Sequence, residues 1–593
     1  MIRALSILCV MASVGTTLPG VAANPKAPSF QVEVGASVRH DTSPPLREMA
    51  IPLDQTEGPG SPFLEIDNRM IPLEIAGRAG SSPGDPSKMS IQRTRGLARA
   101  PVVNLSVDGL GISDYVGLGL GTLAPAAPNG DVGTEYFIQY VNLMWAVFDK
   151  TDGALVFGPF YGNSFWDGFG GACETNNAGD PLVLYDHVAD RWVFSQFTGL
   201  GTPRQCFAVS TTNDPLGPYH RYEFDLWGGQ INDYPKIGIW IDEPALGRAT
   251  GVRSGYYMTS NDFAPGFEGV SAIALERDEM LVGGSAATVR FEIDPSGSDT
   301  WFSLQPPHLE GNVLPPAGAC APFVQAWDDE VWSEENQDTQ DFYAFFNLCV
   351  NWAALGSSTL IGPGNVGAGV EYDANLCNFG ACQSQPETTQ ELDTLGQYTM
   401  YRAQVRGLDA TARGGEEYRM VVSHTSDVGG DQAGVHWAEL DLTAALSDST
   451  GATFPSIIQT ATFAPDGDNR SFPSIAMDRA GNIAVSYAVM SSSTFPSMRY
   501  SAREPSDPLG TLRNEAVCVD GSGSQTGSSR WNDYTSISVD PVNGCTYWMT
   551  GQYVATTDSL SWDTRICSFH VPNCMDIFAD RFESEKSPVG HPH

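Results

Sequence analysis

One pattern constrains the fold of this 593-residue chain more than any other: an aspartate recurs after a short apolar run at a nearly constant interval. The intervals are 55 and 56 residues between Asp131, Asp186 and Asp242, and 62 residues between Asp478 and Asp540. A second run of aromatic or β-branched residues follows in several of the repeats. A strand, an aspartate turn and a second strand form the central hairpin of a propeller blade, and a four-stranded blade fills one such period.

The repeat predicts an all-β chain folded as an approximately seven-bladed β-propeller over residues 101–572. Asp242 and Asp478 are 236 residues apart, which leaves room for three further blades with insertions. In a closed ring each blade covers the next, so no long sheet edge stays unpaired. Two tandem β-sandwiches are the alternative, which the regular interval disfavours. Helices are expected to be few, and residues 270–280 are one candidate.

The two ends of the chain differ from this region in composition. Residues 1–23 have a basic start, an apolar middle and small residues up to Ala23, the three parts of a secretory signal peptide that we expect to be cleaved after Ala23. Residues 24–100 are rich in Pro and Gly and predict a flexible, disordered leader with a short strand or two. Residues 573–593 predict a short tail. The mature protein is therefore expected to be secreted, at the cell surface or periplasmic, with no segment apolar enough to span a bilayer.

The cysteines agree with export. Ten of the eleven remain after removal of the signal peptide, and an even number in an oxidising compartment predicts five disulfides. Connectivity stays open at this point, but the economical pairing joins near neighbours: Cys173–Cys206, Cys320–Cys349, Cys377–Cys382, Cys518–Cys545 and Cys567–Cys574. The spacing of Cys and His matches no zinc site.

Charge and missing motifs exclude several functions. With 70 acidic and 32 basic residues the formal net charge is -38, which repels nucleic acids and anionic lipid surfaces. The sequence holds no Gly-x-Ser-x-Gly elbow, Walker loop, His-Glu-x-x-His or dinucleotide fingerprint, so the commonest hydrolase, nucleotide and zinc-protease motifs are absent. We expect a monomer that binds no nucleic acid.

Several segments of the repeat region carry a family resemblance. Three of them are residues 129–133 (Asn-Gly-Asp-Val-Gly), 139–142 (Gln-Tyr-Val-Asn) and 179–192 (Gly-Asp-Pro-Leu-Val-Leu-Tyr-Asp-His-Val-Ala-Asp-Arg-Trp). The other three are residues 233–236 (Asp-Tyr-Pro-Lys), 421–425 (Val-Val-Ser-His-Thr) and 529–534 (Ser-Arg-Trp-Asn-Asp-Tyr). As a set they resemble a family of secreted bacterial β-propeller proteins of largely uncharacterised function. The resemblance covers about residues 105–570, implies the fold and export, and transfers no catalytic residue. Residues 576–583 are similar to a short ending of exported Gram-negative proteins, with Arg581 in place of Gly.

A weaker likeness is to sialidase-type propellers, whose blades carry Ser-x-Asp-x-Gly-x-x-Trp boxes. Here one residue too many separates Asp478 from Gly481, and two too many separate Asp540 from Gly544. We interpret these aspartates as turn caps that accept backbone N–H bonds.

Five residues are candidates for chemistry on the loop face. Asp233 with Tyr234, and Asp533 with Tyr534, occupy equivalent repeat positions, and a carboxylate beside a phenol suits binding of sugar hydroxyls or acid–base catalysis. His424 ends an apolar strand, with carboxylates nearby that suit a general base. The structural alternatives are equivalent packing at equivalent positions and a histidine that is hydrogen-bonded at a strand end.

An acidic run suggests a cation site. Residues 328–341 contain seven carboxylates and no Lys or Arg. Oxygen ligands at this density suit Ca²⁺, and the candidate ligands are Asp328, Asp329, Glu330 and Asp338. The spacing differs from that of an EF-hand loop, so a solvated acidic loop is the alternative.

Two functional hypotheses follow. The first is an extracellular binding or interaction module for a polysaccharide or a protein, with calcium as the one cofactor considered. The second is a carbohydrate-active enzyme, a glycoside hydrolase or polysaccharide lyase, with its site on the loop face. One deep pocket lined by carboxylates, His and Tyr would favour the enzyme, and a broad aromatic surface would favour binding.

Overall fold

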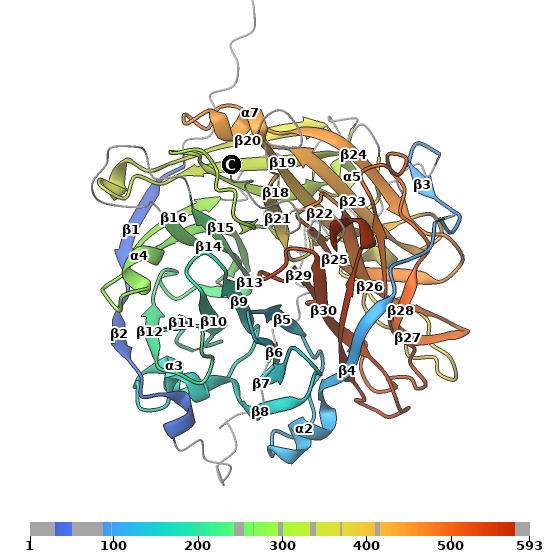
Figure 1. Ribbon diagram of the computed structural model, residues 1–593, viewed down its shortest axis with the longest axis horizontal. Coiled ribbons are helices and arrows are strands. Elements are labelled where there is room, and N and C mark those ends of the chain that lie inside the picture. The colour runs from blue at the N-terminus through green and yellow to red at the C-terminus, as the bar shows by residue number, and fades with distance from the viewer. Residues whose placement is uncertain are drawn as a thin grey trace, which may run out of the picture.

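Seven sheets arranged in a ring make up the protein (Figure 1). The computed structural model describes residues 30–49, 87–96, 98–199, 201–241, 254–264, 266–293, 300–332, 340–367, 371–408 and 416–575. Within these residues each sheet has between three and six strands, and each is one blade of a propeller. The prediction of an all-β, approximately seven-bladed propeller is therefore confirmed.

The blades follow one another along the chain, and within a blade the strands are almost all antiparallel neighbours. Blade 1 contains β5 (Asn129–Val132), β6 (Tyr136–Val141), β7 (Met144–Asp149) and β8 (Leu155–Tyr161). Blade 2 contains β9 (Leu182–Asp186), β10 (Arg191–Phe197), β11 (Gln205–Ser210) and β12 (Tyr219–Phe224). Blade 3 contains β13 (Ile231–Ile241), β14 (Ser254–Phe263), β15 (Phe267–Glu276) and β16 (Ala287–Ile293). Blades 4 and 5 contain β18 (Ala321–Trp327), β19 (Phe342–Cys349) and β20 (Thr359–Gly367); and β21 (Ala403–Leu408), β22 (Glu417–Asp427), β23 (Ala433–Asp441) and β24 (Ser456–Phe463). Blades 6 and 7 contain β25 (Asn469–Met477), β26 (Ile483–Ser491), β27 (Thr494–Arg503) and β28 (Ala516–Val519); and β29 (Ser536–Val539), β30 (Thr546–Tyr553), β31 (Asp563–His570) and β4 (Val103–Gly111).

Short helices connect the strands. They are η1 (Leu46–Glu48), α2 (Ile112–Gly117), η2 (Gly162–Trp166), α3 (Ala172–Thr175), α4 (Arg277–Met280), α5 (Asp329–Trp332), η3 (Leu355–Ser357), η4 (Cys377–Phe379) and α7 (Thr443–Ser447). The expected helix over residues 270–280 is wrong, because β15 continues to Glu276 and only α4 is helical. β15 is buried on both faces, and a continuous apolar run of this kind has the same pattern in a buried strand as in a helix.

Segments from outside the blades add strands at their edges. The described part of residues 24–100 contributes β1 (Val32–Ala36), β2 (Arg39–Thr42) and β3 (Ile91–Gln92), which pair with β16, β12 and β24 at the outer edges of blades 3, 2 and 5. On the inner side, β17 (Pro307–Glu310) pairs in parallel with β21. These additions cover sheet edges that would otherwise be open to pairing with another chain.

The ring closes by joining its first strand to its last blade. β4 precedes blade 1 in sequence but pairs with β31 as the outermost strand of blade 7, where its blue ribbon lies beside the red blade in Figure 1. Buried Gln139 of β6 connects blade 1 to this closing blade. Its Oε1 accepts the N–H of Leu110 at 2.7 Å, and its Nε2 donates to Thr550 and Thr564 at 2.7 and 2.8 Å.

Three of the repeated aspartates cap the turn between the first two strands of their blades, whereas Asp131 lies inside β5 and accepts the N–H of Tyr185 in blade 2 at 2.9 Å. Asp186 accepts the N–H of Ala189, Asp478 accepts those of Ala480 and Asn482, and Asp540 accepts that of Val542. Their expected role as acceptors of backbone N–H bonds is confirmed, whereas Asp242 lies outside the described residues. The 62-residue interval between Asp478 and Asp540 therefore reflects the same hairpin turn in blades 6 and 7.

Three junctions between blades are made at or near the first residues of an inner strand. Asp180, Tyr234 and Phe472 have left-handed φ values of +45°, +51° and +51°, and each precedes a proline. A side chain of the preceding blade accepts the N–H of each: Asn142 from Asp180 at 3.1 Å, Asp180 from Tyr234 at 3.0 Å, and Thr425 from Phe472 at 3.2 Å. These bonds offset a backbone conformation that costs about 1–3 kcal/mol per residue.

Five disulfides are present, three of them as predicted. Cys173–Cys206, Cys320–Cys349 and Cys377–Cys382 agree with pairing of near neighbours. The predicted pairs Cys518–Cys545 and Cys567–Cys574 are wrong, because the bonds are Cys518–Cys567 and Cys545–Cys574. The first of these joins the outer strand β28 of blade 6 to β31 of blade 7, a contact between blades that sequence separation does not reveal.

The predicted signal peptide and most of the tail lie outside the described residues. Among the described helices, none has the length and apolar character needed to cross a bilayer. Five disulfides suit an oxidising compartment.

Replacement of Gln139 by leucine is expected to weaken the closure of the ring. The variant leaves the buried N–H of Leu110 without its acceptor, and a lost buried partner costs about 1–3 kcal/mol. The Gln139→Leu protein should therefore unfold at lower urea concentration than the wild type. Gln31→Leu, at an exposed position, is the control, and equal midpoints for the two variants would contradict this role of Gln139.

Candidate functional sites on the propeller axis

The inner strands define two faces of the propeller, a start face where these strands begin and an end face where they finish. Asp180 precedes β9 and Asp533 precedes β29, so both lie at the start face. His187 and Asp540 directly follow the same two strands and lie at the end face. Each end of the axis carries a group of charged side chains.

A buried acidic cluster lies at the start face. Asp180, Asp233 and Asp533 are each at most 5% exposed, and Lys236 and Arg530 accompany them. Arg530 forms an ion pair with Asp533, and Lys236 Nζ lies 3.4 Å from the centre of the Tyr234 ring. The structure thus brings together residues from blades 2, 3 and 7.

Burial and mutual repulsion shift the titration of this cluster. Burial, and next the charge of Asp533, raises the pKa of Asp180 to about 7. Burial, followed by the charge of Asp180, raises the pKa of Asp233 well above its usual value. Burial likewise lowers the pKa of Lys236, although the three aspartates oppose that shift. Shifted carboxyl groups of this kind mark a candidate acid–base site.

Tyr234 and Tyr534 connect blades 3 and 7 across the axis. Tyr234 donates its hydroxyl to the backbone carbonyl of Asp533, and Tyr534 donates its hydroxyl to the carbonyl of Pro235 at 2.9 Å. The two rings are 4.7 Å apart, and both are buried. Their phenol groups therefore cross-link the backbone at equivalent repeat positions.

The connection from β20 to β21 covers this cluster. Tyr398 packs edge-on against Tyr234 with ring centres 4.9 Å apart. Within the same connection Asp393 donates its N–H to the carbonyl of Ser529 at 2.8 Å, and Gln385 donates to that of Gln525 at 2.9 Å. We name residues 371–402 of this connection the cap.

His424 lies apart from the four residues at the axis. Its ring, on β22, packs against Tyr372 and His436, with ring centres 4.6 and 4.7 Å away. Nδ1 lies 3.1 Å from the carbonyl oxygen of Thr425. Burial lowers the pKa of His424 to about 4, so the imidazole is neutral at physiological pH. Asp427, the nearby carboxylate, accepts the N–H of Gly429.

The acidic run forms a second carboxylate cluster beside blade 4. Ligand atoms of Asp328, Asp329, Glu330 and Asp341 all lie within 4.8 Å of one another. Asp338, the fourth predicted ligand, lies outside the described residues. Asp341 is part of the same acidic run but was not among the predicted ligands.

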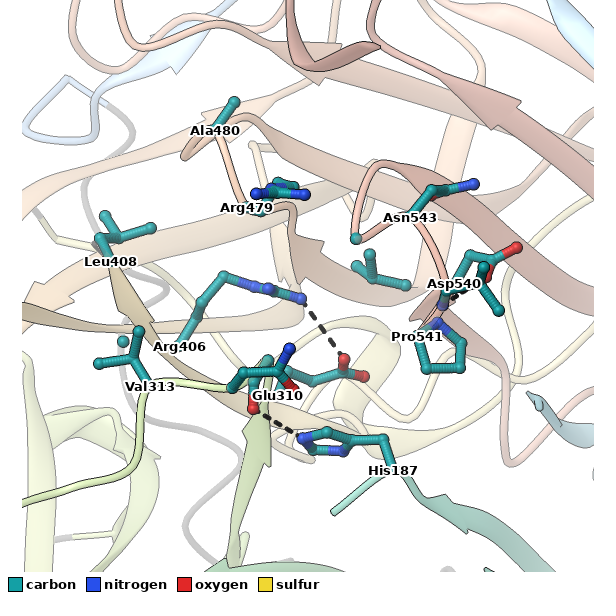
Figure 2. A pocket seen from close by; sticks show the side chains of 16 residues that line it. His187, Glu310, Val313, Arg406, Leu408, Arg479, Ala480, Asp540, Pro541 and Asn543 are labelled. Atoms are coloured by element: carbon teal, nitrogen blue, oxygen red, sulfur yellow. Dashed lines mark hydrogen bonds and ion pairs between the residues drawn. The ribbon is translucent and has the colours of Figure 1, made fainter. Parts of the chain in front are cut away.

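A pocket of about 420 Å³ opens at the end face. Five short segments, each at or just after the end of an inner strand, supply its lining, as Figure 2 shows for most of them. The lining residues are His187, Glu310, Gly311, Asn312, Val313, Arg406, Gly407, Leu408, Arg479, Ala480, Val539, Asp540, Pro541, Val542, Asn543 and Gly544. The sequence hypothesis did not include this site, although aspartate turns at 478–481 and 540–544 lie in it.

The charged groups of the pocket are held in pairs. Glu310 lies 3.4 Å from Arg406 and 3.6 Å from His308. Burial by itself raises the pKa of Glu310, but the hydrogen bond and charge of His308 and the charge of Arg406 lower it to about 2. Asp540 pairs with Lys150 at 3.0 Å. His187 Nε2 lies 2.8 Å from the Gly311 carbonyl, the lower dashed contact in Figure 2.

Comparisons with known proteins give only distant similarity. No protein-family model and no curated protein matches the sequence. Among solved structures, the chain is similar to extracellular domains 1–2 of Drosophila Semaphorin 1b, at 8% identity and a TM-score of 0.32, over 80% of this chain and 87% of the other. It is also similar to an endo-arabinase from Bacteroides thetaiotaomicron, at 13% identity and a TM-score of 0.27, over 56% of this chain and 95% of the other. A third similar structure is an exo-β-1,3-galactanase from Clostridium thermocellum, at 11% identity and a TM-score of 0.25, over 79% of this chain and 97% of the other. The resemblance to secreted bacterial propellers stays a prediction.

The raised pKa of Asp180 predicts a pH-dependent effect on stability. A carboxyl whose pKa is higher in the folded state than in the unfolded chain favours folding most when protonated, so its contribution falls as pH rises from about 4 to about 7. Asp180→Asn keeps an acceptor for the Tyr234 N–H and removes this titration. We expect the variant to gain thermal stability relative to the wild type at pH 8 compared with pH 4.

The control for this prediction is Asp152→Asn, because exposed Asp152 also accepts one backbone N–H, from Ala154. Its melting temperature relative to the wild type should be the same at both pH values. A gap between Asp180→Asn and the wild type that does not change with pH would contradict the raised pKa.

Proposed function

We propose that this protein is an exported binding module that holds a segment of a protein partner in the pocket at the end face. The observation that carries this proposal is the pocket itself, about 420 Å³ in volume and built by segments from different blades around the axis. Propellers gather ligand contacts from loops distant in sequence in this way. Five disulfides support export to an oxidising compartment.

The lining suits a peptide segment. Val313, Leu408, Pro541 and Val542 provide apolar contact beside the polar groups of His187 and its neighbours. The residues that line the pocket include no Phe, Tyr or Trp, so the pocket offers no such ring on which a sugar could stack. A protein ligand is therefore favoured over a polysaccharide.

Charge indicates the kind of partner. A net charge of -38 produces a field that attracts basic molecules and accelerates their association. The acidic groups of the pocket are neutralised by Arg406 and Lys150, so attraction comes from the protein as a whole. We expect a partner segment with net positive charge, bound more weakly as ionic strength rises.

Val542 provides a direct test of the pocket. It lies on the lining and is 61% exposed, so Val542→Arg places a charge in the pocket without disturbing the core. The matched control is Val282→Arg, at a 70% exposed valine of blade 3. Peptides selected from a displayed random library on the wild-type protein should be rich in Lys and Arg. They should bind the Val282→Arg control as tightly as the wild type, and their affinity for Val542→Arg should be lower by about tenfold or more.

Two results would contradict the proposal: no enrichment of any peptide, or equal binding by Val542→Arg and Val282→Arg. A glycan array probed with the same three proteins addresses the other ligand class. If the wild type binds a polysaccharide and Val542→Arg does not, the pocket remains the proposed binding site, but its ligand is a polysaccharide instead of a protein.

A carbohydrate-active enzyme is the second candidate, because three carboxyl groups meet at the start face and the pKa of Asp180 is raised to about 7. A carboxyl with that pKa suits a general acid. The contacts described above oppose it, since the cap covers the cluster and both phenol groups donate to backbone carbonyls.

Incubation with a panel of polysaccharides tests the enzyme directly. If the protein were such an enzyme, new reducing ends or absorbance of unsaturated uronates would appear with the wild type and disappear with Asp233→Asn, while Val282→Arg would stay active. We expect no product with any polysaccharide. Turnover that depends on Asp233 would overturn this expectation and favour the enzyme.

A further inference from the structure

The carboxylate cluster beside blade 4 is positioned by backbone N–H groups. Asp328 accepts the N–H groups of Glu330 and Val331 through Oδ1 and that of Ala374 through Oδ2, at 2.7–3.1 Å. These bonds fix the Asp328 carboxylate between helix α5 and the cap. Carboxylates held by backbone donors keep further lone pairs for another ligand.

Asp341 is fixed in the same manner. Its Oδ1 accepts the N–H of Asp329 at 3.1 Å, and its Oδ2 accepts that of Tyr372 at 2.6 Å. The two best-anchored carboxylates of the cluster therefore both reach from blade 4 to residues 372–374 of the cap. The geometry is set before any ion arrives.

One oxygen of the cluster is buried and has no hydrogen-bond partner within the described part of the chain. Asp329 is 6% exposed, and its Oδ1 contacts no donor among these residues. Leaving a carboxylate oxygen buried and unpaired is costly, and native proteins normally supply a donor or a metal ion. A carboxylate oxygen of Asp329 lies within 4.8 Å of carboxylate oxygens of the other three residues, so a cation placed among them would reach this carboxylate.

Negative charges surround the cluster. Asp328, Asp329 and Asp341 are each at most 6% exposed, so three carboxylates that lie close together are all held away from solvent. Elsewhere in the fold a buried aspartate such as Asp186 pairs with an arginine, here Arg277 at 2.6 Å.

We infer that Asp328, Asp329, Glu330 and Asp341 bind a Ca²⁺ ion that fastens the cap to blade 4. Four carboxylates offer the hard oxygen ligands that Ca²⁺ prefers, and its flexible geometry tolerates a mixed set with backbone carbonyls or water completing the shell. The site is independent of the pocket at the end face, so it stands or falls separately from the proposed binding function.

Terbium luminescence measures binding at this site. Tb³⁺ takes the same oxygen ligands as Ca²⁺, and Trp327 and Trp332 flank the cluster in sequence and can sensitise its emission. Titration of the metal-free protein should give saturable Tb³⁺ emission that Ca²⁺ displaces. Asp329→Asn and Glu330→Gln should each weaken Ca²⁺ binding about tenfold or more. Glu268→Gln, which removes one exposed carboxylate of blade 3, should bind as the wild type does.

Thermal unfolding separates loss of binding from loss of folding. Ca²⁺ should raise the melting temperature of the wild type and of Glu268→Gln relative to the same proteins in EGTA, because a ligand of the native state stabilises it. In EGTA, Asp329→Asn should melt at or above the wild-type temperature, since it relieves repulsion, and Ca²⁺ should raise its melting temperature less than that of the wild type. Equal melting temperatures of the wild type in Ca²⁺ and EGTA, absence of sensitised Tb³⁺ emission, or wild-type affinity in both variants would overturn the inference.

Discussion

The propeller depends on a hydrogen bond between neighbouring blades, in which a side chain of one blade accepts the backbone N–H at the start of the next. Asn142, Asp180 and Thr425 are such acceptors. Without them a buried donor would lose its partner, at a cost of about 1–3 kcal/mol at each site. Asp180 is acceptor for one blade and donor to another, so these bonds run continuously through blades 1 to 3. The requirements of ring assembly thus place a carboxyl group at the axis.

The sequence predicted the parts of this structure that depend on local chemistry. Aspartates that follow apolar strands indicated the blades, because the hairpin turns of blades 2, 6 and 7 each use one as an N–H acceptor. Asp233 and Asp533 were expected to be equivalent from the repeat, and both lie in the cluster at the start face. Contacts between blades left no local pattern. The bond between Cys518 and Cys567 and the pocket at the end face both depend on which strands become neighbours, and neither follows from spacing along the chain.

The two ends of the axis use charged residues in opposite ways. At the start face, aspartates, tyrosines and Lys236 are enclosed by the cap, and their polar atoms hold the backbone of blades 3 and 7 together. At the end face, Glu310 pairs with Arg406 on the lining of the pocket and Asp540 pairs with Lys150, and the pocket beside these pairs stays open. The polar groups at the start face therefore stabilise the fold, while those at the end face line a pocket that is open to solvent.

Closure by β4 constrains the order in which the ring can assemble. The partner of this strand, β31, follows it by more than 450 residues, so it is synthesised long after β4. Until β31 is present, the amide groups of β4 have no strand to pair with, and blade 1 has an uncovered neighbour. A chain truncated within blade 7 would therefore leave both β4 and the exposed side of blade 6 without a partner.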